Sequence, residues 1–129
     1  MSLKLEKLML AMTEHEGWQT PKEASATLGS RSYRNHNPGN LRASPFQSGQ
    51  LDGFAFFKSD AVGYFAFYWD IQQKAKGNTS TGLNGESTLR QFIAKWAPSS
   101  DGNNTEAYLQ AIVKNSGLPE TTKLKEFLE

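Results

Sequence analysis

The stretch LEKLMLAMTEHEGW, residues 5–18, predicts an amphipathic helix with an acidic side chain on its apolar face. Four apolar residues recur with the i, i+3, i+4, i+7 spacing of one buried helix face: Leu5, Leu8, Met9 and Met12. At about 100° per residue, Glu16 falls within roughly 20° of Leu5 on that face. Glu14 falls on the opposite side, where a charged side chain meets solvent. The helical phase therefore predicts a half-buried Glu16 and an exposed Glu14.

Glu16 is a candidate general acid. Gly17 and Trp18 follow it and end the predicted helix, so the carboxyl group lies at a helix end beside an aromatic ring. A buried, unpaired carboxylate is costly, and such a group tends to keep its proton. A carboxylic acid that is protonated near neutral pH is what general acid catalysis requires. The alternative is a structural Glu at a helix end, which reaches water or caps a nearby amide.

Composition excludes several classes of protein. The 129 residues suit one domain over residues 1–129 with a real core. The 14 Lys and Arg residues nearly balance 13 Asp and Glu residues, which argues against nucleic acid as a partner. The absence of cysteine excludes disulfides and thiol catalysis. Only His15 and His36 are histidines, which argues against a His-rich metal site, and we expect no metal and no cofactor.

Nothing in the sequence predicts insertion into a membrane. No apolar run approaches the length of a membrane span. The first residues, MSLKLEK, lack the apolar core of a secretory signal. We therefore expect synthesis in the cytoplasm, with another agent needed if the target lies outside it.

Beyond the first helix, the pattern predicts a mainly α, α+β fold. Residues 19–53 are rich in Gly, Pro, Ser, Asn and Gln, and residues 53–57 read as a strand of a small hairpin or three-stranded patch. Ser59 is a candidate N-cap for a helix to Lys76, closed by Gly77. We expect this helix to be the central buried one, through Val62, Phe65, Ala66, Tyr68, Trp69 and Ile71.

Three shorter helices are predicted in the last third of the chain. The first is capped by Ser87 or Thr88 and stops at Pro98, and residues 99–104 form a loop. The second opens at Asn104 or Thr105 and ends before Gly117. A terminal helix follows Pro119, with three apolar residues on its inner side: Leu124, Phe127 and Leu128.

The segment RNHNPGNLR, residues 34–42, is a second candidate for function. Pro38 and Gly39 predict a tight turn, and Asn37 and Asn40 flank it with amide donors and acceptors. Amides on a rigid loop beside aromatic rings suit a sugar, which has many hydroxyls and one apolar face. The alternative is that these Asn residues tolerate turn geometry and hydrogen-bond their own backbone.

Taken together, these segments resemble a lysozyme-like family that is common among phage and prophage virion-associated proteins. The resemblance runs from about Leu8 to Gly117. It rests on EGW (16–18), RNHNPGNLR (34–42), GFAFF (53–57), Thr88-Leu89, WAP (96–98) and DGNNT (101–105) leading into Tyr108. The family is related to the soluble lytic transglycosylases and the goose-type lysozymes. The implied fold is lysozyme-like, with a small β-hairpin region after the first helix.

The resemblance implies cleavage of the β-1,4 bond between N-acetylmuramic acid and N-acetylglucosamine in peptidoglycan. It implies Glu16 as the catalytic acid, Tyr108 close to that carboxylate, and Trp18, Asn37, Asn40 and Tyr108 as residues that bind the glycan. For Tyr108 the alternative is a core aromatic at helical spacing from its neighbours. The implied partners are peptidoglycan glycan strands and other virion proteins, with the cell wall reached through a phage particle or lysis.

The position of a second carboxylate separates two kinds of enzyme. A hydrolase of the usual kind needs two carboxyl groups at the scissile bond. After Glu16 the only acid before Asp52 is Glu23. A single Glu suits a lytic transglycosylase, in which the sugar's own 6-hydroxyl attacks and leaves a 1,6-anhydro end. Three later residues stay open as a second carboxylate: Asp52, Asp60 and Asp101. A lysozyme-like structural or glycan-binding protein without turnover is the alternative.

Overall fold

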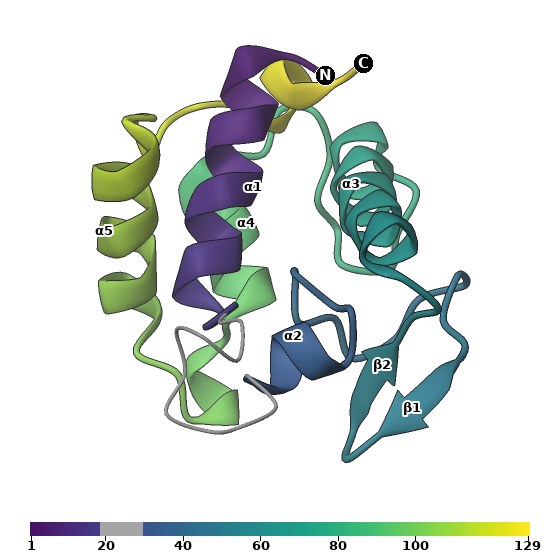
Figure 1. The fold of residues 1–129 in the computed structure, drawn as a ribbon. Coiled ribbons are helices and arrows are strands. Elements are labelled where there is room, and N and C mark those ends of the chain that lie inside the picture. The colour runs from purple at the N-terminus through teal and green to yellow at the C-terminus, as the bar shows by residue number, and fades with distance from the viewer. Residues whose placement is uncertain (19–29) are drawn as a thin grey trace. The chain divides into compact units, whose positions relative to one another are not determined.

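The structure is a computed structural model, and it describes residues 1–18 and 30–129 (Figure 1). The described chain is mainly helical with a two-stranded antiparallel sheet, which confirms the α+β, mainly α class. The α-helices are α1 (Leu3–His15), α2 (Arg31–Arg34), α3 (Asp60–Lys76), α4 (Leu89–Trp96) and α5 (Thr105–Ser116). The strands are β1 (Gly49–Leu51) and β2 (Phe54–Phe56), and the 3-10 helices are η1 (Ser99–Asp101) and η2 (Leu124–Phe127). None of the described helices combines the length and the apolar character needed to cross a membrane.

Two compact units share the chain. The first unit comprises residues 1–11 and 71–129, and the second unit comprises residues 12–70. Both changes of unit fall inside helices, one in α1 and one in α3, rather than in loops. The expectation of a single domain stays a prediction.

Helix ends in the first unit follow the predicted capping signals. Thr88 caps α4 through a capping box, in which its side chain accepts from the Gln91 N–H and the Gln91 side chain accepts from the Thr88 N–H. The side chain of Asn104 caps α5 by accepting from the Ala107 N–H. Gly117 ends α5 in the left-handed region, at φ 74°. One predicted loop is wrong in part, because residues 99–101 form η1.

Apolar residues of α4, α5 and η2 form the core of the first unit. The members with the largest fully buried side chains are Leu89, Phe92, Ile93, Leu109, Ile112, Leu124 and Phe127. Leu128, predicted on the inner side of the last helix, is exposed instead. It lies one residue beyond η2, where the chain has left the helical turn.

An ionic cluster lies on the surface of the first unit. Both terminal oxygens of Glu86 are paired, at 2.7 Å with Lys123 Nζ and at 2.8 Å with Lys125 Nζ. Hydrogen bonds from these two ammonium groups lower the pKa of Glu86 to about 2. The carboxylate therefore stays charged, and keeps its link to the last segment of the chain, until the pH falls to about that value.

In the second unit, α3 begins where the sequence predicts, but it buries only part of the predicted face: Ala66 is fully buried, whereas Val62, Tyr68 and Trp69 are half-buried. The Ser59 side chain accepts from the Val62 N–H at 3.3 Å, which confirms the predicted N-cap. Phe65, expected in the core, is 49% exposed, and its ring lies edge-on to that of Phe46, 5.1 Å between centroids. Phe67 is fully buried in its place. Aromatic residues spread over more than half of the circumference of this helix, so periodicity alone does not select the inner side.

The predicted hairpin is confirmed as a two-stranded one. Gly49 pairs with Phe56 and Leu51 with Phe54. Asp52 and Gly53 form the connecting pair with φ of 53° and 81°, which matches the twist of a tight hairpin. Within the described residues the sheet has no third strand.

The turn at residues 37–40 packs directly on α3. The Asn40 N–H donates to the Asn37 carbonyl at 2.9 Å, which closes the predicted turn. Gly39 does not adopt a positive φ. It is needed because a Cβ at this position would lie 2.8 Å from the Phe67 ring. One turn of helix earlier, a Cβ on Gly63 would lie 1.8 Å from the carbonyl oxygen of His36.

We therefore expect Gly63→Ala to destabilise the second unit. Within a helix this replacement normally stabilises by about 0.5–1 kcal/mol. Here the new methyl group overlaps a backbone oxygen, and overpacking of this kind costs about 1–3 kcal/mol or more. Thermal or urea unfolding measures the sign of the effect. Ala61→Gly, on the exposed side of the same helix, is the control for helix propensity alone. A stabilised Gly63→Ala variant would contradict the close approach of these two backbones.

Candidate functional site

The end of α1 fixes the position of Glu16. The helix ends at His15, and not at Trp18 as its apolar pattern predicts. The Trp18 N–H donates to the Thr13 carbonyl at 3.2 Å, and the Gly17 N–H donates to the Glu14 carbonyl at 3.1 Å. With Gly17 at φ 80°, these two bonds form a Schellman motif, in which Glu16 is the C-cap residue. Backbone hydrogen bonds of the neighbouring residues thus fix the position of Glu16 at the helix end.

Glu16 is half-buried and Glu14 is exposed, as the helical phase predicts. The Glu16 N–H still donates to the Met12 carbonyl at 2.8 Å, so the residue keeps the helical hydrogen bond that sets its phase. Glu16 therefore stays near the apolar side of α1 although it lies beyond the last helical residue.

Asn40 brings the Asn-rich turn to this carboxyl group. Its Nδ2 donates a long hydrogen bond of 3.4 Å to Glu16 Oε1. The backbone of Asn40 lies in the left-handed region, at φ 49°, which Asn tolerates better than most residues. Its Oδ1 is buried and has no partner within the described residues. This contact places the turn at residues 37–40 against the end of α1.

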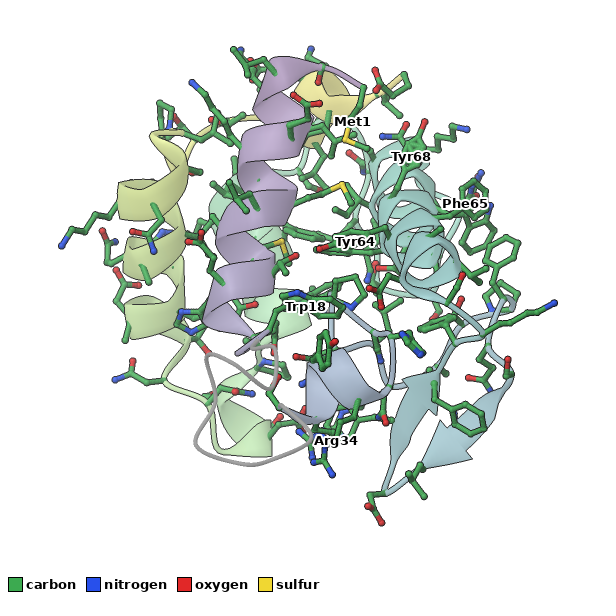
Figure 2. All side chains as sticks on the ribbon, in the orientation of Figure 1. Met1, Trp18, Arg34, Tyr64, Phe65 and Tyr68 are labelled. Atoms are coloured by element: carbon green, nitrogen blue, oxygen red, sulfur yellow. The ribbon has the colours of Figure 1, made fainter. Side chains whose placement is uncertain are left out.

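Three aromatic rings lie together beside the end of α1. The Trp18 ring centroid is 5.4 Å from that of Tyr33 and 5.8 Å from that of Tyr64. Figure 2 shows Trp18 and Tyr64 next to each other. Burial and the charge of Asp60 raise the pKa of Tyr64, so its hydroxyl remains a hydrogen-bond donor through the neutral range.

Sequence reasoning missed Tyr33 and Tyr64. Tyr33 lies in α2, a four-residue helix within a stretch predicted to be irregular. Tyr64 is 40% exposed on α3, one residue before the Phe65 that periodicity placed in the core. A Trp directly after a helix end was the available signal that further aromatic residues gather there.

Asn37 is a structural residue and does not present the amide predicted to bind substrate. Its side chain is fully buried. Nδ2 donates to the carbonyls of Leu41 and Ala55 at 2.8 and 2.9 Å, and Oδ1 accepts from the Leu41 N–H at 2.8 Å. These bonds tie the turn to β2 and use both ends of the amide. No polar atom is left for a sugar.

The remaining acidic candidates have positions of their own. Asp52 is exposed at the tip of the hairpin, and Asp60 pairs with His36 Nδ1 at 2.6 Å. Asp101 is exposed in η1 of the first unit, and Glu23 lies outside the described residues. Among the residues that the structure describes, no group of three or more His, Cys, Asp or Glu side chains could hold a metal ion.

Tyr108 lies on α5 in the first unit, where it is buried. Its place near Glu16, which belongs to the second unit, stays a prediction.

No protein-family model matches the chain, and neither a curated protein nor a solved structure gives a significant match. A function for this chain therefore rests on its own residues.

Proposed function

We propose that this protein cleaves peptidoglycan glycan strands at the β-1,4 bond between N-acetylmuramic acid and N-acetylglucosamine, as a lytic transglycosylase with a lysozyme-like fold. The observation that carries the proposal is the contact between Asn40 Nδ2 and Glu16 Oε1. It joins two segments, 24 residues apart, that the sequence marks independently as a general acid and a glycan-binding turn. Action on the cell wall would follow delivery by a phage particle or lysis, with virion proteins as further partners.

In the proposed reaction Glu16 acts first as acid and then as base. It donates its proton to the glycosidic oxygen as the bond from that oxygen to C1 of N-acetylmuramic acid breaks. The 6-hydroxyl of the same sugar then bonds to C1 and returns its proton to Glu16. The products are a free 4-hydroxyl and a 1,6-anhydro end, and the enzyme regains its starting state. Asn40 orients the carboxyl group through its amide.

The aromatic rings supply a surface for the sugar. Apolar ring surface lies next to the helix end that carries Glu16, and it comes from Trp18, Tyr33 and Tyr64. Covering the apolar face of a sugar with such rings removes both surfaces from water, which is favourable. The Tyr64 hydroxyl adds a donor for sugar oxygens. These rings also suit a glycan-binding protein without turnover, and only the reaction products distinguish the two.

Mass spectrometry of muropeptides after incubation with purified sacculi tests the proposal. We expect 1,6-anhydro ends. Ordinary reducing ends would identify a hydrolase. Intact strands that retain bound protein would identify a binding module and reject the proposed enzyme.

We expect Asn40→Gly to lower the rate of glycan cleavage about tenfold or more, because negative charge develops on Glu16 as it gives up its proton and a hydrogen bond to a charged group is worth about 1.5–3 kcal/mol. Glycine keeps the left-handed backbone and removes only the amide, so the unfolding temperature should change little. The matched control is Asp52→Gly, which makes the same kind of change at the tip of the hairpin, where φ is 53°. Equal rates for Asn40→Gly and the parent chain would show that this amide does not position the carboxyl group.

A further inference from the structure

Two arginines of the second unit converge on one phenylalanine. The guanidinium carbon of Arg31 lies 3.8 Å from the centroid of the Phe54 ring, and that of Arg42 lies 5.0 Å from it. The three residues come from α2, from the segment after the turn, and from β2. Gln50 Nε2 donates to the Arg42 carbonyl at 3.0 Å and so fixes its backbone. The fold thus holds two like charges at one ring.

No acidic side chain in the described part of the chain neutralises these charges. Both arginines are exposed, and within the described residues neither forms an ion pair with a carboxylate. Some other basic residues do have acidic partners, as Arg90 has in Glu106 and Glu120. Two unpaired guanidinium groups at one ring repel each other, and a bound anion would relieve that repulsion.

The geometry also determines what kind of anion fits. A guanidinium group at 3.8 Å above a ring uses its flat face for the contact. Its N–H groups point outward in the plane and remain available. Such an edge binds the two oxygens of a carboxylate or a phosphate through a pair of parallel hydrogen bonds.

We propose that Arg31, Phe54 and Arg42 form a binding site for the free carboxylates of peptidoglycan stem peptides. The choice of polymer rests on the proposed function. The lactyl group of N-acetylmuramic acid carries a peptide, so an enzyme that cleaves beside this sugar meets carboxylates attached to the strand it holds. Phosphate groups of other wall polymers share the chemistry, and the experiment separates them.

The test is cosedimentation with insoluble sacculi, in a Glu16→Gln background so that the material is not digested. Three materials are compared: intact sacculi, sacculi freed of wall phosphate polymers, and glycan strands from which an amidase has removed the stem peptides. The test variant is Arg31→Lys with Arg42→Lys, which keeps both charges and loses the planar fork. The matched control is Arg34→Lys, an exposed arginine that lies on α2 like Arg31 and is not one of the two arginines over the Phe54 ring.

At low salt we expect the double variant to bind intact and phosphate-free sacculi about tenfold more weakly than the Arg34→Lys control, which is the loss of one charge-assisted pair. On stripped glycan strands the two should bind alike. Replacing both arginines by Gln should weaken binding further, and equal unfolding temperatures exclude a loss of fold as the cause.

Binding that depends on wall phosphate rather than on stem peptides would overturn the proposal, and so would equal binding by the double variant and its control. The outcome is separate from that of the proposed function. Stem-dependent binding without any cleavage by the parent chain would reject the enzyme and keep this site. Anhydro products with stem-independent binding would do the reverse.

Discussion

Glu16→Gln is expected to reduce glycan cleavage by at least about 10²–10⁴-fold, the usual contribution of general acid catalysis. Gln has the shape of Glu and can hydrogen-bond, but it has no proton to donate to the leaving oxygen. An amide oxygen at this position still accepts from Asn40 Nδ2, so the contact between helix end and turn survives. Turnover of purified sacculi, measured as release of soluble muropeptides, gives the rate, and cosedimentation shows that the variant still binds.

The comparison with other acids decides the type of enzyme. Three replacements should each cost far less than Glu16→Gln, because the proposed reaction uses one carboxyl group: Asp52→Asn, Asp60→Asn and Asp101→Asn. If one of them is as inactive as Glu16→Gln and the products carry ordinary reducing ends, the protein is a hydrolase with two carboxylates. Asp60→Asn also breaks the pair with His36, so its unfolding temperature must be measured alongside.

Asn37→Ala is expected to destabilise the second unit by about 2–5 kcal/mol. The replacement leaves the Leu41 N–H and the Ala55 carbonyl without the buried amide that pairs with them, and each such group costs about 1–3 kcal/mol. It also opens a cavity under the turn. Urea unfolding followed by tryptophan fluorescence measures the effect. Asn40→Gly is the control, because the Asn40 side chain forms one long hydrogen bond rather than three short buried ones and should affect cleavage rather than stability.

A small change in stability for Asn37→Ala, combined with a loss of glycan binding, would contradict the structural role of Asn37. It would restore this residue to the set that contacts the glycan.

Local signals in the sequence predicted helix ends well. Thr88, Asn104 and Gly117 act within one turn of chain, so the pattern of neighbouring residues contains all the information needed. The half-buried position of Glu16 followed from the same kind of reasoning, because helical phase is a local property. The hairpin was likewise predicted from the apolar strand at residues 53–57, although its tip at Asp52 and Gly53 was not.

Contacts between distant segments were not predictable in this way. Asn37 and Asn40 are the same residue type in one motif. Only the packing of residues 37–41 against β2 buries the Asn37 side chain in hydrogen bonds to the backbone and leaves that of Asn40 to hydrogen-bond with Glu16. The choice between Phe65 and Phe67 depends on where the loop with Gly39 lies. The contact between Tyr33 and Trp18 was not predictable either, because Tyr33 lies in a helix too short to leave a periodic pattern.

The backbone of Asn40 has a consequence for natural variation at this position. A φ of 49° favours Gly, Asn, Asp and His, but Gly has no side-chain amide and Asp would place a second carboxyl group against that of Glu16. Asn meets both demands. Lineages that retain an acid at position 16 are therefore expected to retain Asn at 40, whereas lineages that lose the acid are free to drift to Gly. The two positions should change together, and the order of loss along a phylogeny would date the end of catalysis.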